Sequence, residues 1–452
     1  MPQPVRDPSL FLRARERQEA GVVRALSIAV AVVSSSAWAG PLDPPLNVGY
    51  VRTLGEVEPR IPLNPNDNPE APGLLINAPG SYFLTGNIIG TSGNNGIEIN
   101  ANHVTLDLNG FALLGVPGSL DGIVVTGGTR LNISVFNGTV RGWGDDGIDA
   151  GGAINSNFSD LRLNSNAGDG IRLRQGTLSR LSVRGNGLDG VDVGEGSLVT
   201  DSTSTHNGAL GFKLGTGAVI SRSAAMSNIS SGIGTGHACV IESCYARGNQ
   251  TGGIVTGEDC SVYASTAMDN GFVGFSSTKG GTFVGCTARS NTSTGFQIGT
   301  GGLARGCSSE ENQQQGFIVN RGARASECTA RGNLLSGFLA TEGTLEGCEA
   351  TGSINGFVID NRGVARRCTA RGNTDGFDIM GTGALVEECF AEGNSAKGFD
   401  VTGTANLIRK NVVRGNPTGF SVAAGNASAQ IIDMTAGAIG FQSNQPWANF
   451  RF

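Results

Sequence analysis

Three carboxylates and a tryptophan lie together in the segment GWGDDGIDAGG, residues 142–152. Asp145, Asp146 and Asp149 fall within five residues of one another and follow Trp143 closely. Paired acids beside an aromatic ring are typical of sites that act on glycosidic bonds, and clustered carboxylates are ligands that calcium prefers. The segment therefore raises two hypotheses, a carbohydrate site and a calcium site. In either, we expect Trp143, Asp145 and Asp149 to contact a substrate.

The elements that must position these residues belong to a repeat. A glycine followed by Ile, Val or Phe recurs at intervals of 19 to 26 residues, most often 21. Such a period indicates a repeat architecture, and a unit this short excludes helical pairs and propeller blades. The Leu pattern of leucine-rich repeats is missing. The repeat glycines are Gly96, Gly122, Gly147, Gly170, Gly190, Gly211, Gly232, Gly253, Gly274, Gly295, Gly316, Gly337, Gly356, Gly376, Gly398, Gly419 and Gly440.

Each unit, such as Gly316–Ser336, carries short alternating runs separated by turn residues. Three short strands and three bends form one triangular coil, and stacked coils bury a shared core. Phe follows the later repeat glycines, and an Asn stands four residues before most of them, a residue suited to turns and to left-handed backbone. We therefore predict an all-β solenoid of three-strand coils with about 21 residues each.

These ladders resemble those of right-handed parallel β-helix proteins of the pectate-lyase-like superfamily. The segment Pro79–Val125, with PGSYFLTGN and GIEINANHVTLDLNGFALLG, is similar to the first coils of secreted bacterial β-helix repeat proteins. The resemblance implies a right-handed single-stranded parallel β-helix over residues 79–452, with 79–95 as an N-terminal cap region and 440–452 as a C-terminal cap. It specifies the fold, whereas this scaffold hosts many functions.

The N-terminal residues predict export. Four arginines between positions 13 and 24 precede the apolar run Ala25–Val33, and Ala37-Trp38-Ala39 fits an A-x-A cleavage site. We expect 1–39 to be a signal peptide, with an amphipathic helix of the mature fold as the alternative. Residues 40–78 are rich in Pro and are typical of a linker or strap. The protein would then be secreted, to the periplasm, the cell surface or the medium, with no transmembrane segment in the mature chain.

The net charge bears on the possible ligands, and the cysteine spacing bears on the state of the thiols. The net charge of −6 gives no electrostatic reason to bind nucleic acid. Seven of the nine cysteines share one repeat position, and Cys239 and Cys260 form a second short column. Stacked equivalent cysteines predict a column of buried free thiols rather than disulfides, since in-register neighbours are poorly oriented to bridge. The seven are Cys244, Cys286, Cys307, Cys328, Cys348, Cys368 and Cys389.

The residue after each repeat Ile, Val or Phe points outward if that apolar residue points inward. This outer position holds Asp149, Arg172, Asp192 and Lys213 on four successive coils. The resemblance to pectate-lyase-like enzymes implies Asp149 and Asp192 as calcium and substrate ligands, with Arg172 or Lys213 as catalytic base. The alternative is a surface ladder of alternating charge, which stabilises adjacent strands modestly.

A second acidic column immediately precedes four repeat glycines and includes Asp146 and Asp169. Asp before Gly is common turn chemistry, but stacked carboxylates repel one another unless they are protonated, hydrated or bridged by a cation. Calcium held by Asp146 and Asp169 is therefore a further hypothesis. The column is Asp121, Asp146, Asp169 and Asp189.

Two further patterns bear on function. Gly144-Asp145-Asp146 resembles the Gly-Asp-Asp of polygalacturonase-like hydrolases, but the His-containing motif at 236–238 lies four coils away, so we discount that reaction. Ile318, Leu339 and Val358 form an apolar stripe in the outer column. The stripe predicts either a partner or self-association face, or a surface covered by the Pro-rich segment.

Two functions remain open. One is a non-catalytic β-helix with a carbohydrate-binding, structural or adhesive role on its elongated face. The other is a polysaccharide lyase or epimerase that acts on an acidic glycan with calcium and an Arg or Lys base.

Overall fold

The computed structural model describes residues 59–64, 73–435 and 445–452. All described residues belong to one compact unit, Pro59–Phe452. The predicted signal peptide, most of the Pro-rich segment and residues 440–444 of the predicted C-terminal cap lie outside the described residues.

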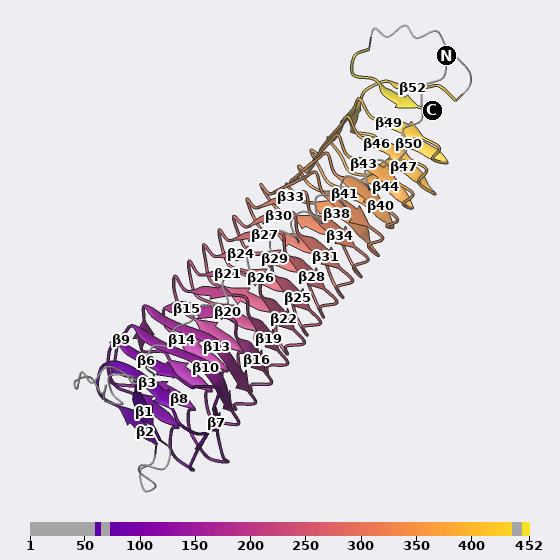
Figure 1. Ribbon diagram of the computed structural model, residues 1–452. Coiled ribbons are helices and arrows are strands. Elements are labelled where there is room, and N and C mark those ends of the chain that lie inside the picture. The colour runs from indigo at the N-terminus through magenta and orange to yellow at the C-terminus, as the bar shows by residue number, and fades with distance from the viewer. Residues whose placement is uncertain (1–58, 65–72, 436–444) are drawn as a thin grey trace, which may run out of the picture. The chain divides into compact units, whose positions relative to one another are not determined.

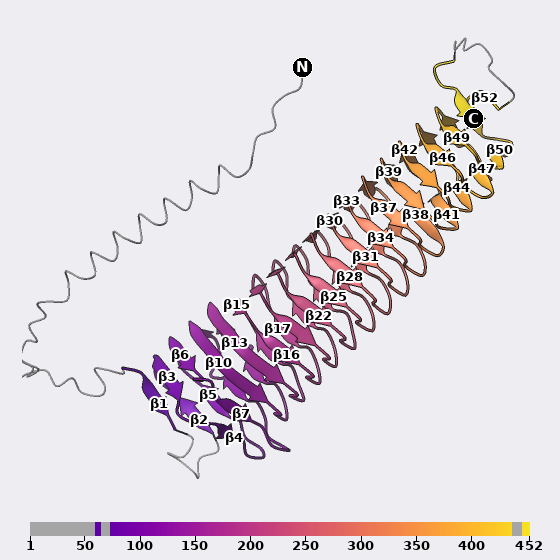
Figure 2. The ribbon, with the colours of Figure 1, turned by 45° about the vertical axis from the view of Figure 1, so that its right-hand side comes forward.

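In the described part of Pro59–Phe452 every regular element is a β-strand, and neighbouring strands pair in parallel. Figures 1 and 2 show the coils stacked in chain order, from indigo at the N-terminal end to yellow at the C-terminal end. Each coil contributes up to three short strands, one to each of three faces. The prediction of an all-β parallel solenoid is confirmed.

Face 1 contains the strands that follow the repeat glycines. Its strands are β2 (Leu74–Ile76), β5 (Ile97–Ile99), β8 (Ile123–Val125), β11 (Ile148–Ala150), β14 (Ile171–Leu173), β17 (Val191–Val193), β20 (Phe212–Leu214), β23 (Ile233–Thr235), β26 (Ile254–Thr256), β29 (Phe275–Ser277), β32 (Phe296–Ile298), β35 (Phe317–Val319), β38 (Ser336–Ala340), β41 (Asn355–Ile359), β44 (Asp375–Ile379), β47 (Lys397–Val401) and β50 (Thr418–Val422).

Face 2 follows face 1 in each coil. Its strands are β1 (Ile61–Leu63), β3 (Gly80–Leu84), β6 (Val104–Asp107), β15 (Gly176–Ser179), β18 (Leu198–Thr200), β21 (Val219–Ser221), β24 (Val240–Glu242), β27 (Ser261–Tyr263), β30 (Thr282–Val284), β33 (Leu303–Arg305), β36 (Arg324–Ser326), β39 (Thr344–Glu346), β42 (Val364–Arg366), β45 (Leu385–Glu387), β48 (Leu407–Arg409) and β51 (Ala427–Ser428).

Face 3 completes the coil. Its strands are β4 (Ile88–Ile89), β7 (Ala112–Leu114), β16 (Ser182–Arg184), β19 (Thr203–Thr205), β22 (Ala224–Met226), β25 (Tyr245–Arg247), β28 (Thr266–Met268), β31 (Thr287–Arg289), β34 (Ser308–Glu310), β37 (Thr329–Arg331), β40 (Glu349–Thr351), β43 (Thr369–Arg371), β46 (Phe390–Glu392), β49 (Val412–Arg414) and β53 (Asn449–Arg451), and β53 also pairs with β52 (Ile431–Asp433).

The first coils differ from the later ones. The long strands β10 (Ile133–Arg141) and β13 (Ser156–Asn164) run through the corner between faces 2 and 3 and pair with strands of both. A short ladder joins β9 (Arg130–Leu131) to β12 (Ala153–Ile154). In addition, β1 pairs with β3 and β2 pairs with β5. The solenoid therefore already includes strands from the segment that the sequence indicated as a linker.

Stacked phenylalanines fill the core beneath face 1. From Phe275 to Phe420, consecutive rings are parallel to within 10° and their centroids lie 4.6–5.0 Å apart. This distance matches the spacing of paired strands, because each ring occupies the same position in successive coils. The predicted aromatic ladder is therefore present, and most of these rings are among the largest fully buried side chains of the described residues.

Buried asparagines connect the coils at the corner before face 1. The side-chain amide of Asn249 donates to Oδ1 of Asn270 at 3.0 Å, and that same oxygen accepts the backbone N–H of Asn249 at 3.1 Å. The pattern repeats along the corner and satisfies polar groups that have no access to water. One coil interrupts it: Ser353 occupies the ladder position, and its Oγ has no hydrogen-bond partner.

All nine cysteines are buried and unbridged, as predicted. In the long column, Sγ of Cys286 lies 3.4 Å from the carbonyl oxygen of Val262, to which it donates. Burial raises the pKa of the thiol of Cys244 to about 11, so this thiol is protonated at neutral pH. The column therefore acts as a row of small buried side chains with satisfied S–H donors.

Candidate functional site

The four predicted outer residues lie side by side on face 1. Backbone register places Asp149 of β11 beside Arg172 of β14, Arg172 beside Asp192 of β17, and Asp192 beside Lys213 of β20. The sequence therefore predicted the adjacency correctly. It did so because the residues following the repeat glycines alternate strictly between core and surface.

Arg172 contacts three carboxylates. Its guanidinium pairs with Oδ2 of Asp146, and its Nε lies 3.9 Å from both Oδ1 of Asp149 and Oδ2 of Asp169. The hydrogen bond with Asp146, followed by the Coulomb attraction of these acids, raises the pKa of Arg172 above its usual range. Arg172 therefore stays protonated and serves as the counter-ion of the acidic column.

Lys213 is engaged in a similar way. Its Nζ lies 3.0 Å from Oδ2 of Asp192 and 3.6 Å from Oδ2 of Asp189. The hydrogen bond with Asp192 raises the pKa of Lys213, and the neighbouring acids add to the shift. A raised pKa works against the base role that the resemblance implied for Arg172 and Lys213, because a base must be neutral to accept a proton.

The acidic column before face 1 is a ladder of backbone acceptors. Oδ1 of Asp121 accepts the backbone N–H of Asp146 at 3.0 Å, and Oδ1 of Asp146 accepts that of Asp169 at 2.7 Å. Oδ1 of Asp169 in turn accepts the N–H of Asp189 at 2.8 Å. Each Asp thus caps the next coil with one oxygen, as the asparagines do in their own column, and the second oxygens of Asp146, Asp169 and Asp189 face Arg172 or Lys213.

Burial makes these carboxylates harder to ionise. It raises the pKa of Asp121 and of Asp169 to about 6, and neighbouring acids add to both shifts. Burial also raises the pKa of Asp146, although Arg172 opposes this shift. The negative charges of the acidic column are therefore only partly neutralised by side-chain cations.

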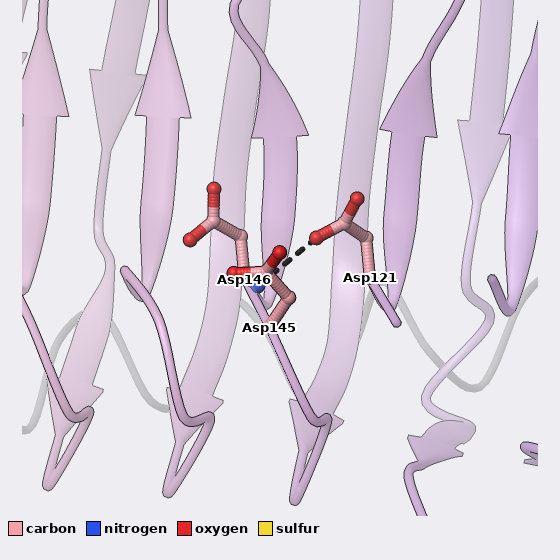
Figure 3. Close-up of side chains that lie close together, drawn as sticks. All are labelled: Asp121, Asp145 and Asp146. Atoms are coloured by element: carbon pink, nitrogen blue, oxygen red, sulfur yellow. Dashed lines mark hydrogen bonds between the residues drawn. The ribbon is translucent and has the colours of Figure 1, made fainter. Parts of the chain in front are cut away.

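One group of carboxylates in the described residues has the spacing to hold a metal ion. Oxygen atoms of Asp121, Asp145 and Asp146 all lie within 4.8 Å of one another. Figure 3 shows the three side chains gathered at one corner, with the hydrogen bond from Asp146 to Asp121 between them. Three carboxylates suit calcium, which would complete its shell with water or ligand oxygens.

The geometry does not bring the predicted calcium ligands together as a set. Between Asp149 and Asp192 lies the strand that carries Arg172, so a guanidinium separates their side chains in register. Asp146 and Asp169 both contact this same guanidinium. Of the predicted calcium ligands, only Asp146 belongs to the group with metal-binding spacing, together with Asp121 and the solvent-exposed Asp145.

Trp143 is buried, contrary to the prediction that it contacts a substrate. It is 1% exposed and lies inside the first coils, where its Nε1 donates to the carbonyl oxygen of Leu113 at 3.3 Å. A Cβ on Gly90 or Gly96 would lie within 3 Å of the indole ring, so these glycines make room for it. Its backbone N–H is capped by Asn166, which places Trp143 at the ladder position with its ring turned inward.

A pocket of about 520 Å³ opens beside the outer column at the corner after face 1. Its polar lining includes Arg172 and Asp192, and also Arg174, Gln175 and Glu195, which the outer-column alignment did not single out. These three follow the inward residues of β14 and β17 at equivalent corner positions. Their stacking could have been inferred from the repeat, since Arg174-Gln175 and Gly194-Glu195 fall in the same register.

A second acidic pair lies on face 1 near the C-terminal end. Asp378 of β44 and Asp400 of β47 are in register, and Lys397 pairs with Asp400. Burial raises the pKa of Asp378 to about 6, and Asp400 and Asp375 add to the shift. Here two acids are direct neighbours beside one cation, whereas in Asp149–Lys213 two acids alternate with two cations.

The expected apolar stripe is only partly open. Val358 is 5% exposed, and Ile318 and Leu339 are half-buried. The exposed apolar side chains of these coils lie instead at the corner before face 1, at Leu334 and Ile354. Among the described residues, no helix is long and apolar enough to cross a membrane.

The family comparison agrees with this architecture. Residues 304–436 match the family model described as a right-handed β-helix region. Together with the parallel ladders on three faces, the match confirms the predicted right-handed parallel β-helix. A sequence search of curated proteins gives no significant match.

Several solved structures of polysaccharide-active enzymes are similar to this chain. The A-module of Azotobacter vinelandii mannuronan C-5 epimerase AlgE4 is 12% identical with a TM-score of 0.33, over 78% of this chain and 91% of that one. Pectate lyase Pel9A is 14% identical with a TM-score of 0.21, over 78% of this chain and 70% of that one. The catalytic domain of a GH87 α-1,3-glucanase in complex with nigerose is 9% identical with a TM-score of 0.29, over 78% and 64% of the two chains.

Proposed function

We propose that this protein is a secreted β-helix that binds a polysaccharide on face 1, at the pocket beside Arg172 and Asp192. The observation that carries this proposal is the pocket itself, about 520 Å³ in volume and lined by side chains from neighbouring coils. A solenoid face presents equivalent positions at a regular spacing, which suits a polymer with a repeating unit. The export-type N-terminus of the sequence agrees with an extracellular polymer as ligand.

Binding is favoured over catalysis by the state of the cations. Arg172 and Lys213 each contact at least two carboxylates, and both have raised pKa values. They are suited to hold the acidic column together and to donate hydrogen bonds. Proton abstraction from a sugar would require one of them to be neutral first.

Polymer retention in native gels tests the proposal. Wild-type protein should be retarded by at least one polysaccharide of a broad panel, and the double variant Arg174→Ala/Glu195→Ala should lose the retardation. A matched control is Arg305→Ala/Glu349→Ala, which removes the same charges from exposed or half-exposed positions on faces 2 and 3. Absence of retardation by every polymer, or equal retardation of the pocket variant, would overturn the proposal.

A second candidate function is a calcium-dependent lyase or epimerase. One observation favours it: the grouping of Asp121, Asp145 and Asp146, whose oxygens could hold a divalent cation. Calcium there would neutralise the acids and bind a uronate carboxylate of the substrate. Incubation of uronate polymers with the protein and calcium, followed by detection of unsaturated or epimerised products, distinguishes this activity from binding alone.

A further inference from the structure

The charges around the face 1 pocket indicate which class of polysaccharide it would take. We propose that the ligand is a polysaccharide of uncharged hexose units and not a polyuronate. This inference rests on the proposed function, because it names the ligand of the same pocket. It follows from the charge balance of the pocket, from the hydrogen-bonding groups that remain available in it, and from the charges on the surrounding coils.

The pocket lining is balanced in charge. It contains two cations, Arg172 and Arg174, and two carboxylates, Asp192 and Glu195. Arg172 is committed to its acidic neighbours, and Asp192 is paired with Lys213. The inner members of each sign are thus neutralised before any ligand arrives, and an anionic sugar would find no uncommitted cation at the centre of the pocket.

The outer members offer both donors and acceptors. Arg174 donates to Oγ1 of Thr129 at 3.0 Å and keeps its other N–H groups available. Within the described residues, Glu195 has no ion-pair partner and the side chain of Gln175 has no hydrogen bond, and both are exposed. Sugar hydroxyls both donate and accept, so a mixed set of a carboxylate, an amide and a guanidinium suits them better than a set of donors alone.

Apolar contact is available as well. The half-buried Ile154 lines the pocket next to these polar groups. Uncharged pyranose rings present C–H surfaces that gain from such contact, because apolar area is removed from water on binding. A pocket that combines an aliphatic wall with a few convergent polar groups is typical of sites for neutral ligands.

The surrounding coils are strongly acidic. On face 1 and its two adjacent corners, between residues 95 and 217, nine carboxylates stand against four cationic side chains. A polyuronate carries one negative charge per sugar and would be repelled along the whole of this surface. The carboxylates are Glu98, Asp121, Asp145, Asp146, Asp149, Asp169, Asp189, Asp192 and Glu195, and the cations are Arg130, Arg172, Arg174 and Lys213.

One route to uronate binding exists and defines the competing outcome. Calcium held by Asp121, Asp145 and Asp146 would reverse the local charge and bridge to a uronate. In that case binding would require calcium and would weaken with chelator. A neutral polymer needs no such bridge, so its affinity should change neither with calcium nor with chelator.

The experiment compares neutral polymers (dextran, a β-1,3-glucan and a galactomannan) with polygalacturonate and alginate, each in calcium or in EDTA. We expect retention by a neutral polymer in both conditions, with less than about a two-fold change in Kd between low and high salt, because no net charge is neutralised. Retention by uronates alone, in calcium, would overturn the inference while leaving the proposed function intact. Retention by no polymer would overturn both.

A charge-reversal variant separates the same alternatives on the protein side. Glu195→Lys removes an acceptor and adds a cation. It should therefore weaken the binding of a neutral glycan by about ten-fold, the effect of losing one good hydrogen bond. The same substitution would strengthen the binding of a uronate polymer. Glu349→Lys, on face 3, is the matched control and should leave either affinity unchanged. Tighter binding by Glu195→Lys would contradict the inference.

Discussion

Asp146 uses both carboxylate oxygens to hold the coil that follows it: Oδ1 accepts the backbone N–H of Asp169, and Oδ2 pairs with Arg172. The Asp146 side chain and Asp169 are buried, whereas the Arg172 side chain is about half exposed, so removal of the carboxylate leaves the Asp169 N–H without a partner while water can reach Arg172. Asp146 thus connects the acidic column to the outer charged column, and we expect both contacts to stabilise the first coils.

Two substitutions of Asp146 should separate the contributions of these two contacts to stability. Asp146→Asn keeps an acceptor for the Asp169 N–H and loses the charge, whereas Asp146→Ala loses both contacts and leaves a buried donor unsatisfied. We expect Asp146→Ala to be less stable than Asp146→Asn by about 1–3 kcal/mol in urea unfolding. Glu349→Ala, which removes an ion pair with Arg371 at 3.6 Å, should cost less than about 1 kcal/mol. Equal stability of the two Asp146 variants would show that Oδ1 contributes nothing.

The buried carboxylates predict an unusual pH dependence. The pKa values of Asp121 and Asp169 are raised to about 6 in the folded protein, above the value near 4 expected when unfolded. A raised carboxyl pKa means that the folded state binds protons more tightly, so these groups favour folding at low pH, and that contribution is lost as pH rises through about 6. Thermal melting should therefore show a higher Tm near pH 5 than near pH 7.5.

The variant Asp121→Asn/Asp169→Asn should flatten that profile between pH 5 and pH 7.5, because it removes the two titrating groups. An unaltered profile in the variant would assign the pH dependence to other residues.

The repeat glycines predict a steric effect. A Cβ on Gly316 would lie 2.5 Å from the carbonyl oxygen of Gly337 on the next coil and 2.7 Å from Nδ2 of Asn333. Gly316→Ala should therefore cost about 1–3 kcal/mol through overpacking. Gly234 on β23 is the control, since its Cβ would approach only the flexible side chain of Leu210, at 3.1 Å. Similar losses for Gly316→Ala and Gly234→Ala would mean that close coil approach is not the reason for the repeat glycine.

The interrupted asparagine ladder predicts a stabilising change. Ser353 leaves its Oγ unsatisfied, whereas Oδ1 of Asn373, on the following coil, accepts the backbone N–H of Ser353 at 2.9 Å. Ser353→Asn should extend the ladder across this coil and raise the free energy of unfolding by about 1 kcal/mol. Denaturant unfolding of the two proteins measures the difference. A loss of stability would show that this shorter coil has no room for the amide.

The fold was predictable because its signals are periodic. A 21-residue period with alternation inside each strand determines which residues face the core and which coils are neighbours, so the repeat alone aligns Asp149, Arg172, Asp192 and Lys213. The cysteine column followed from the same alignment. The long strands β10 and β13 could not be foreseen, because Asn137-Gly138 is a turn signal in the sequence, yet the strands continue through this corner with Asn137 and Asp160 at positive φ.

The site was less predictable because long side chains do not follow backbone register. Arg172 reaches Asp146 on the preceding coil as well as Asp149, its neighbour in register. Trp143 followed the ladder alignment but turned inward, since space left by glycines on other coils decides its rotamer. Glu195 was overlooked because corner residues lack the alternation that marks strands.

Calorimetric titration with the polysaccharide that retains the protein most strongly tests the central claim most directly. Wild-type protein and the control Arg305→Ala/Glu349→Ala should give the same Kd, and Arg174→Ala/Glu195→Ala should bind at least about ten-fold more weakly, since two hydrogen-bonding side chains of the pocket are lost. If the pocket variant binds as tightly as wild type, the polysaccharide site is not on this part of face 1.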